Sequence, residues 1–172
     1  ASAATLWVSW QLDGGAAAVN EAGRMRMQSY RLSLSVSTGD KAALATQAQA
    51  FEHSLALLQR GDPERPLFVP WDERVHQHFA SVTQDWRRYS ARWLYIPNAT
   101  PNLTGLSSDT AQFATRIDHL VDAIEAHLAR WTALLHLLQM SMLALAVLGA
   151  AVLLLCGYLY VLEPVGQLKT AI

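Results

Sequence analysis

An uncharged run near the end of the chain constrains the fold more than any other feature. Between Trp131 and Leu162 there is no Asp, Glu, Lys or Arg, and residues 137–160 are almost all Leu, Ala, Val, Met and Gly. A helix needs about 20 apolar residues to cross a bilayer, and this run exceeds that length. The alternative is a core helix of a soluble protein, but a domain this small rarely encloses such a run. The sequence therefore predicts a transmembrane helix over 137–161.

The opening residues are also apolar in character. Residues 1–12 carry Trp7 and Trp10 near their end, where tryptophan suits the headgroup level of a membrane. The segment is too short to cross a bilayer alone, and it has neither a basic region nor the usual cleavage site of a signal peptide. We interpret residues 1–12 as the outer end of a first transmembrane helix.

Residues 13–136 show the spacing of amphipathic helices. Gly39 and Asp40 stop the first helix, and proline-containing connectors follow at 61–70 and 96–105. The fourth helix is expected to begin after Ser107-Ser108-Asp109, a cluster that suits an N-cap. The expected helices run from the N-terminus to about 38, over 41–60, over about 71–93, and from about 109 into the apolar run. Short connections favour antiparallel neighbours, so we expect an all-α fold with an antiparallel four-helix bundle between two membrane segments.

Composition argues against several classes of function. The net charge is -1 and there is no basic stripe, which disfavours nucleic-acid binding. Cys156 is the only cysteine, so no internal disulfide forms. The six histidines lack the spacing of a shared metal site; His76 and His78, for example, are two apart and lie on different helix faces. No catalytic constellation is present. We therefore expect no metal, no cofactor and no enzymatic activity in this segment.

The first helix carries two apolar stripes side by side. Steps that alternate between four and three residues, the spacing of a coiled-coil seam, define the first stripe: Leu12, Ala16, Val19, Gly23, Arg26, Tyr30 and Ser33. The second stripe comprises Ala18, Ala22, Met25, Ser29, Leu32 and Val36. We expect one stripe to pack on the fourth helix of the same chain and the other to face a partner.

Arg26 stands on the first stripe, with Gly23 one turn before it. If this stripe faces a two-fold related copy, two guanidinium groups about 6–7 Å apart repel by about 2–3 kcal/mol at an effective dielectric near 20. A planar oxyanion between them would accept paired N–H bonds from both and reverse that sign. The alternative is an arginine that snorkels or pairs internally, since Asp118, Asp122 and Glu125 on the fourth helix could form ion pairs with Arg24, Arg26 or Arg31.

The surrounding run resembles the signature of the nitrate/nitrite sensor histidine kinases of the NarX and NarQ type. Those sensors carry Ala-Gly-x-x-Arg-Met-Gln-Ser-Tyr-Arg-Leu, which Ala22, Gly23, Arg26 and Met27 to Leu32 match. The resemblance implies that Arg26 from each subunit binds nitrate or nitrite at the axis of a homodimer. It also implies that Gly23, Ala22, Met27 and Tyr30 shape or support that site.

The same resemblance implies an architecture and a location. Residues 13–136 would form a periplasmic sensor domain of a protein in the bacterial inner membrane. Residues 162–172 are similar to the opening of a HAMP signalling segment. The parent protein would be a two-component histidine kinase, with a response regulator as the partner of its cytoplasmic region.

Part of the run departs from the kinase pattern. Arg24-Met25 replaces a common Ser-Leu pair, and Ala-Gly-Arg-x-Arg-Met is instead similar to the PilJ-type sensors of chemotaxis transducers. Glu21 adds a negative charge near the proposed anion site. Two alternatives to the kinase therefore stay open: the sensor of a methyl-accepting chemotaxis transducer, and a membrane-anchored bundle that binds a partner protein and no anion.

Overall fold

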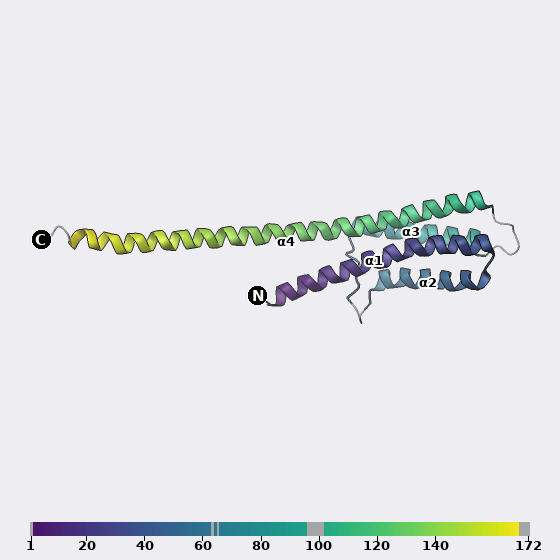
Figure 1. Cartoon of the computed structure of the whole chain (residues 1–172), viewed down its shortest axis with the longest axis horizontal. Helices are drawn as coiled ribbons and strands as arrows, with labels where there is room; N and C mark the ends of the chain where they lie inside the picture. Colours follow the sequence, from purple (N-terminus) through teal and green to yellow (C-terminus); the bar gives the residue numbers. More distant parts are fainter. Residues whose placement is uncertain (1, 63, 65, 96–101, 169–172) are drawn as a thin grey trace. The chain divides into compact units, whose positions relative to one another are not determined.

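The computed structural model of the chain describes residues 2–62, 64, 66–95 and 102–168. These residues form four helices (Figure 1). The helices are α1 (Ser2–Thr38), α2 (Lys41–Arg60), α3 (Glu73–Trp93) and α4 (Leu103–Leu168). Across these described ranges the only extended pairing is an isolated antiparallel bridge between Asp62 and Leu67 in the α2–α3 connector. The predicted all-α fold is confirmed.

Short polar caps reverse the chain between the first three helices. Gly39 adopts a φ of 70°, which glycine tolerates without strain, and α1 ends there. Asp40 then caps α2 by accepting a 3.0 Å hydrogen bond from the Ala43 amide. Asp72 caps α3 in the same way, through a 2.8 Å bond from the Val75 amide. Successive helices therefore run antiparallel, as Figure 1 shows for α1, α2 and α3.

The predicted start of the fourth helix is wrong. α4 begins at Leu103, so Ser107-Ser108-Asp109 lies inside the helix. The cap is Asn102, whose Oδ1 accepts a 3.2 Å hydrogen bond from the Gly105 amide. A single asparagine is enough to begin a helix, and Ser and Asp are readily accommodated in the first turns after it. The predicted loop over 96–105 is correspondingly shorter, although 96–101 lie outside the described residues.

One compact unit covers Ala1–Ala129 and contains the bundle. Its centre is aromatic: the Phe51 ring stacks on Trp86 with centroids 4.4 Å apart and lies 5.3 Å from Phe113. Other fully buried apolar side chains come from all four helices: Met25, Leu32, Leu58, Val75, Val82, Ile117, Leu120 and Ile124. Each such side chain stabilises the fold by about 1.5–3 kcal/mol. The expected antiparallel four-helix bundle is confirmed.

Two glycines on α1 allow close packing near the start of this unit. A Cβ at Gly14 would overlap the ring of Phe68, and one at Gly15 would overlap the side chain of Leu128. The Phe68 amide also donates to the Gly14 carbonyl at 3.4 Å. The helix therefore runs unbroken through Gly14-Gly15, because the contacts that these residues permit offset their weak helix propensity.

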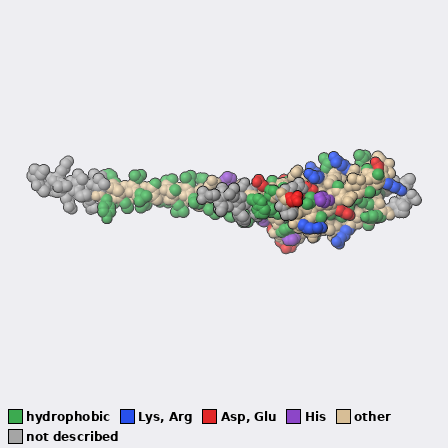
Figure 2. Space-filling model, turned by 90° about the horizontal axis from the view of Figure 1, so that it is seen from below, with side chains coloured by type: hydrophobic (Ala, Val, Ile, Leu, Met, Phe, Trp, Pro, Cys, Tyr) green, Lys and Arg blue, Asp and Glu red, His purple; other side chains and the backbone are tan. Residues whose placement is uncertain are grey.

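The second unit is Arg130–Ile172. Its helix carries large exposed apolar side chains, among them Leu153, Leu154 and Tyr160 at 75%, 76% and 85% exposure. Figure 2 shows hydrophobic side chains along it, whereas most charged ones gather over the bundle. Among the described residues, only α4 is long and apolar enough to cross a membrane, and its most apolar window has a mean hydropathy of 2.5 with 0% buried. Length and composition thus agree with the span predicted over 137–161.

The other predicted boundaries stay predictions. The first membrane helix over 1–12 and the bundle boundary at 136 are not tested, although the compact unit itself ends at Ala129. Of the HAMP-like segment over 162–172, the helix includes residues up to Leu168, and 169–172 lie outside the described residues.

Candidate functional site

The two stripes of α1 have opposite environments. The second stripe is the core stripe: Ala18, Ala22, Met25, Ser29 and Leu32 are each 0% exposed. The first stripe lies beside the core and is only partly covered by the other helices: Val19 packs against the core, and Arg26 contacts Asp118 on α4. Its side chains at Ala16, Arg26 and Tyr30 are exposed, and Val19, Gly23 and Ser33 are partly exposed. The first stripe is therefore the one available to a partner.

Large apolar side chains gather on this outward face of α1. Met27, Tyr30 and Leu34 are 56%, 51% and 63% exposed. A Cβ built at Gly23 would meet nothing within 4 Å, so the backbone there is open to an approaching helix or ligand. A cluster of exposed apolar side chains of this kind marks an interaction surface more often than single exposed apolar residues do. We call Gly23, Arg26, Met27, Tyr30 and Leu34 the α1 face.

Arg26 is held by a carboxylate of the same chain. Its Nη1 donates a 2.9 Å hydrogen bond to Oδ1 of Asp118 on α4. Of the three internal partners that the sequence offered, the tertiary structure selects this one. The two side chains are 52% and 43% exposed, and an exposed ion pair contributes only about 0–1 kcal/mol. Arg26 can therefore change partners at little cost, and its guanidinium keeps further N–H donors for a ligand.

Ala22, which was predicted among the site residues, lies on the buried stripe. Its methyl group is 0% exposed and belongs to the core, so only its backbone can contribute to a site on the α1 face. Gly23, Arg26, Met27 and Tyr30, by contrast, all lie where a ligand or a second copy can reach them.

Glu21, the acidic neighbour of the arginine signature, is turned inward. Its side chain is buried, and its Oε1 accepts a 2.7 Å hydrogen bond from Ser54 Oγ on α2. Its Oε2 lies 3.6 Å from Nη1 of Arg24. Gln28 Nε2 extends this contact by donating to Ser54 Oγ at 3.4 Å. The carboxylate is thus engaged between α1 and α2 and does not oppose an anion on the α1 face.

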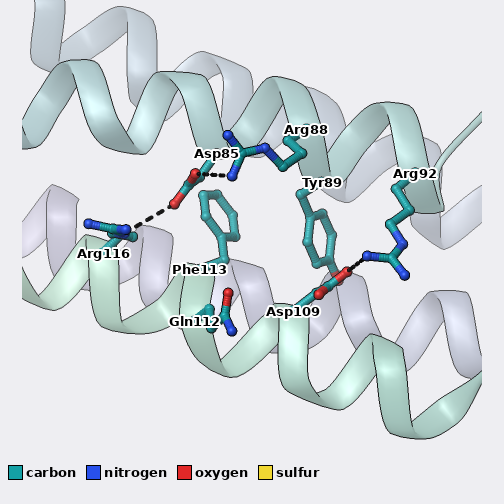
Figure 3. Close-up of a pocket in the computed structure, with 8 residues that line it drawn as sticks. All are labelled: Asp85, Arg88, Tyr89, Arg92, Asp109, Gln112, Phe113 and Arg116. Atoms are coloured by element: carbon teal, nitrogen blue, oxygen red, sulfur yellow. Dashed lines mark hydrogen bonds and ion pairs between the residues drawn. The ribbon is translucent and has the colours of Figure 1, made fainter.

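A second group of charges was missed by the sequence reasoning. Arg88 and Arg92 line a cleft between α3 and α4 together with Arg116 (Figure 3). The available signals were the one-turn spacing of Arg88 and Arg92 and the nearby acidic residues Asp85 and Asp109. Helical spacing alone does not bring Arg116 to the same place.

The histidines form one close pair across helices. The rings of His78 on α3 and His119 on α4 lie 5.9 Å apart. His127 Nδ1 lies 3.0 Å from Asp72 Oδ2, beside the cap of α3. In the part of the chain that the structure describes, no three His, Cys, Asp or Glu residues lie together as a metal site would require.

Comparison with known proteins places the chain in a family. Residues 7–112, more than half of the chain, match the family PilJ, described as "Type IV pili methyl-accepting chemotaxis transducer N-term". The chain belongs to the PilJ family. A curated relative, the methyl-accepting chemotaxis protein McpN of Pseudomonas aeruginosa, is 30% identical over 144 residues, which cover 76% of this chain and 27% of McpN. The chain therefore spans about a quarter of that relative.

A solved structure agrees with this PilJ assignment. The ligand-binding domain of the P. aeruginosa nitrate receptor McpN is similar, with a TM-score of 0.57 and 28% sequence identity. The match covers 63% of this chain and 94% of that domain. The matched structure is a ligand-binding domain, so this PilJ segment is a sensor domain and not an enzyme, as predicted.

The PilJ assignment corrects the interpretation of the signature. The match supports the chemotaxis alternative over the NarX/NarQ histidine kinase. The Ala22 to Met27 half of the run, which includes Arg24, is the part that resembles the PilJ-type sensors.

Proposed function

We propose that this chain is the nitrate-sensing domain and membrane span of a methyl-accepting chemotaxis transducer. Residues 13–136 would lie in the periplasm of a bacterium, with 137–161 in the inner membrane. The observation that carries the proposal is Arg26, exposed on a face of α1 that the chain's own helices leave open. The PilJ assignment and the similarity to a domain described as a nitrate receptor support it.

The α1 face suits a two-fold homodimer. Met27, Tyr30 and Leu34 supply apolar surface, and Gly23 allows backbones to come close. In such a dimer the two copies of Arg26 approach the axis. Nitrate is planar, singly charged and carries three acceptor oxygens, so it can accept bonds from both guanidinium forks. Nitrite offers two oxygens and is the second ligand to test.

Asp118 gives the proposed site a resting state. Without nitrate, each Arg26 pairs with Asp118 of its own chain, which limits repulsion between the two arginines. When nitrate enters, Arg26 turns from Asp118 to the anion, and a polar link between α1 and α4 is released. α4 is one helix from Leu103 to Leu168 and includes the apolar span. A coupling of about 1–3 kcal/mol through this exchange is enough for a usable switch.

Calorimetric titration of the full chain in detergent micelles tests the ligand and its site. We expect saturable nitrate binding at one ion per dimer, no saturable binding of chloride, and at least a tenfold loss in Arg26→Ala, because a bond to a charged group contributes about 1.5–3 kcal/mol. Arg31→Ala is the matched control, since Arg31 is exposed on the same helix but about 140° around it.

Two results would count against this proposal. If Arg26→Ala binds nitrate as well as the parent chain, the site is elsewhere. If the chain is shown by light scattering to be a dimer and no anion gives heat, the bundle binds a partner protein instead.

The output of the full-length protein is tested separately. We expect nitrate to change the methylation of the full-length protein and the swimming response of the cells that carry it. If the full-length protein instead phosphorylates itself on a histidine in a nitrate-dependent way, the parent protein is a sensor kinase, and the α1 site serves a different output.

A further inference from the structure

The cleft between α3 and α4 is lined mainly by charged side chains (Figure 3). Arg88 and Arg92 come from α3 and Arg116 from α4, and the three side chains are 71%, 58% and 56% exposed. Asp85 lies between Arg88 and Arg116, and Asp109 lies beside Arg92. Three cations and two carboxylates leave an excess of one positive charge.

The excess positive charge lies at the end of the cleft that contains Asp85. Its Oδ1 is 3.4 Å from Arg88 Nη1, and its Oδ2 is 3.4 Å from Arg116 Nε. Both distances exceed the 2.7–2.9 Å of a strong charge-assisted bond. One carboxylate is therefore shared loosely by two guanidinium groups, which leaves both with donors for another acceptor.

At the other end of the cleft, the carboxylate of Asp109 is paired with Arg92 and Trp93. Asp109 Oδ2 accepts a 2.9 Å hydrogen bond from Trp93 Nε1 and forms an ion pair with Arg92 Nη1 at 3.0 Å. The Arg92 guanidinium also lies 5.1 Å from the centroid of the Trp93 ring. Arg92 is thereby paired more closely than Arg88 and Arg116, so these two are the arginines more available to an incoming anion.

An apolar floor lies behind these charges. The rings of Phe113 and Tyr89 stack with centroids 5.4 Å apart and are 2% and 4% exposed. The Tyr89 hydroxyl is bound to Thr110 Oγ1 at 3.1 Å, which holds the ring in place. Gln112 adds an uncharged amide to the wall. A rigid apolar floor beneath two guanidinium forks matches a ligand with one carboxylate and a short apolar body.

We propose that this cleft binds a small organic monocarboxylate, at a site independent of Arg26. The carboxylate accepts hydrogen bonds from Arg88 and Arg116 in place of part of their contact with Asp85. Its apolar body lies toward Phe113. Because Arg88 and Arg116 belong to different helices, the bound ligand ties α3 to α4. A single negative charge matches the excess charge of the cleft.

Calorimetry on the full chain in micelles tests this site with acetate and pyruvate at constant ionic strength, against sulfate and nitrate. We expect one carboxylate per subunit and about tenfold weaker binding in Arg116→Gln, the loss of one charge-assisted bond. Arg87→Gln is the matched control, because Arg87 is an exposed α3 arginine outside the cleft. Binding should persist in Arg26→Ala, which separates this site from the nitrate site.

Asp85→Asn distinguishes a ligand site from a purely structural ion-pair network. If the cleft binds a carboxylate, removing its competing carboxylate should tighten binding several-fold. A structural network predicts lower thermal stability and no gain in affinity, which would overturn the proposal. So would the absence of saturable heat with acetate and pyruvate, or sulfate binding as tight as theirs, which would make the site one for inorganic oxyanions.

Discussion

Ser54 on α2 donates a 2.7 Å hydrogen bond to the buried carboxylate of Glu21 on α1. Glu21 stands five residues before Arg26 in the sequence. From this nearness alone, its negative charge would be expected to oppose an anion bound at Arg26. The contact with Ser54 gives the carboxylate a role in joining α1 to α2, while Arg24 of α1 itself lies 3.6 Å from it. The acidic residue and the candidate nitrate arginine therefore belong to different faces of the same helix.

Replacing Ser54 with alanine should destabilise the bundle. The change removes a donor from the buried Glu21 carboxylate, and a bond to a charged group contributes about 1.5–3 kcal/mol. Denaturant unfolding of the micelle-bound chain measures the free energy. Ser108→Ala, at an exposed position of α4, should change it by less than about 0.5 kcal/mol. Equal stability of the two variants would show that the Glu21–Ser54 bond contributes little.

Replacing Asp118 with asparagine should tighten nitrate binding. Without the carboxylate, Arg26 is not held by its own chain and no longer has to leave a partner when the anion enters. An exposed ion pair contributes up to about 1 kcal/mol, so the gain should reach at most about fivefold. Calorimetry measures it, with Asp122→Asn, an exposed position one turn further along α4, as the control. Weaker binding would mean that Asp118 supports the site and does not compete for Arg26.

Replacing Gly23 with alanine should stabilise the subunit and yet weaken nitrate binding. Nothing within 4 Å opposes the added methyl group, so the subunit should gain about 0.5–1 kcal/mol from helix propensity. Nitrate binding should nevertheless weaken, because the methyl group occupies the α1 face that we assign to the dimer axis. Unfolding and calorimetry on the same variant measure the two effects.

Gly14→Ala is the contrasting control for Gly23. There the methyl group would overlap the Phe68 ring, and overpacking of this kind costs about 1–3 kcal/mol. Nitrate affinity of the folded variant should stay unchanged, since neither Gly14 nor Phe68 belongs to the α1 face. If Gly23→Ala leaves nitrate affinity unchanged as well, that residue does not face the axis.

The free energy of unfolding of the bundle should fall at alkaline pH because of the phenol of Tyr89. Burial raises the pKa of its phenol above the ordinary 10.0, and the nearby Asp109 adds to that, while hydrogen bonds with Thr110 and Ser33 oppose it. Below about pH 10 the phenol is protonated in both states and its contribution to stability is complete. Above that pH the unfolded chain ionises first, so the free energy of unfolding falls as the pH rises through the folded pKa.

Tyr89→Phe tests that pH dependence. The variant should lose about 0.5–1.5 kcal/mol near neutral pH with the hydrogen bond to Thr110, and the deficit should shrink as the pH rises above about 10. Denaturant unfolding of both chains across this range gives the difference. A deficit that is constant with pH would show that the phenol does not titrate differently in the folded bundle.

Features that depend on one helix at a time were predicted well. The stop at Gly39 and the extent of α2 agree with the structure, because local caps and helical spacing determine them. The start of α4 was predicted wrongly because two good caps, Asn102 and the Ser107 cluster, compete within one turn and a half. The sequence does not show which of them the packing prefers.

The sequence alone was enough to predict four helices, a membrane-length apolar run and an arginine on a stripe of α1, since each follows from periodicity within one segment. Tertiary structure decided which stripe of α1 is buried and that Arg26 pairs with Asp118. It also decided that Arg116 joins Arg88 across a cleft. The physical reason is that helical spacing defines a residue's angle on its own helix only. Contacts between helices depend on their rotation and axial offset, which arise from packing the whole core at once.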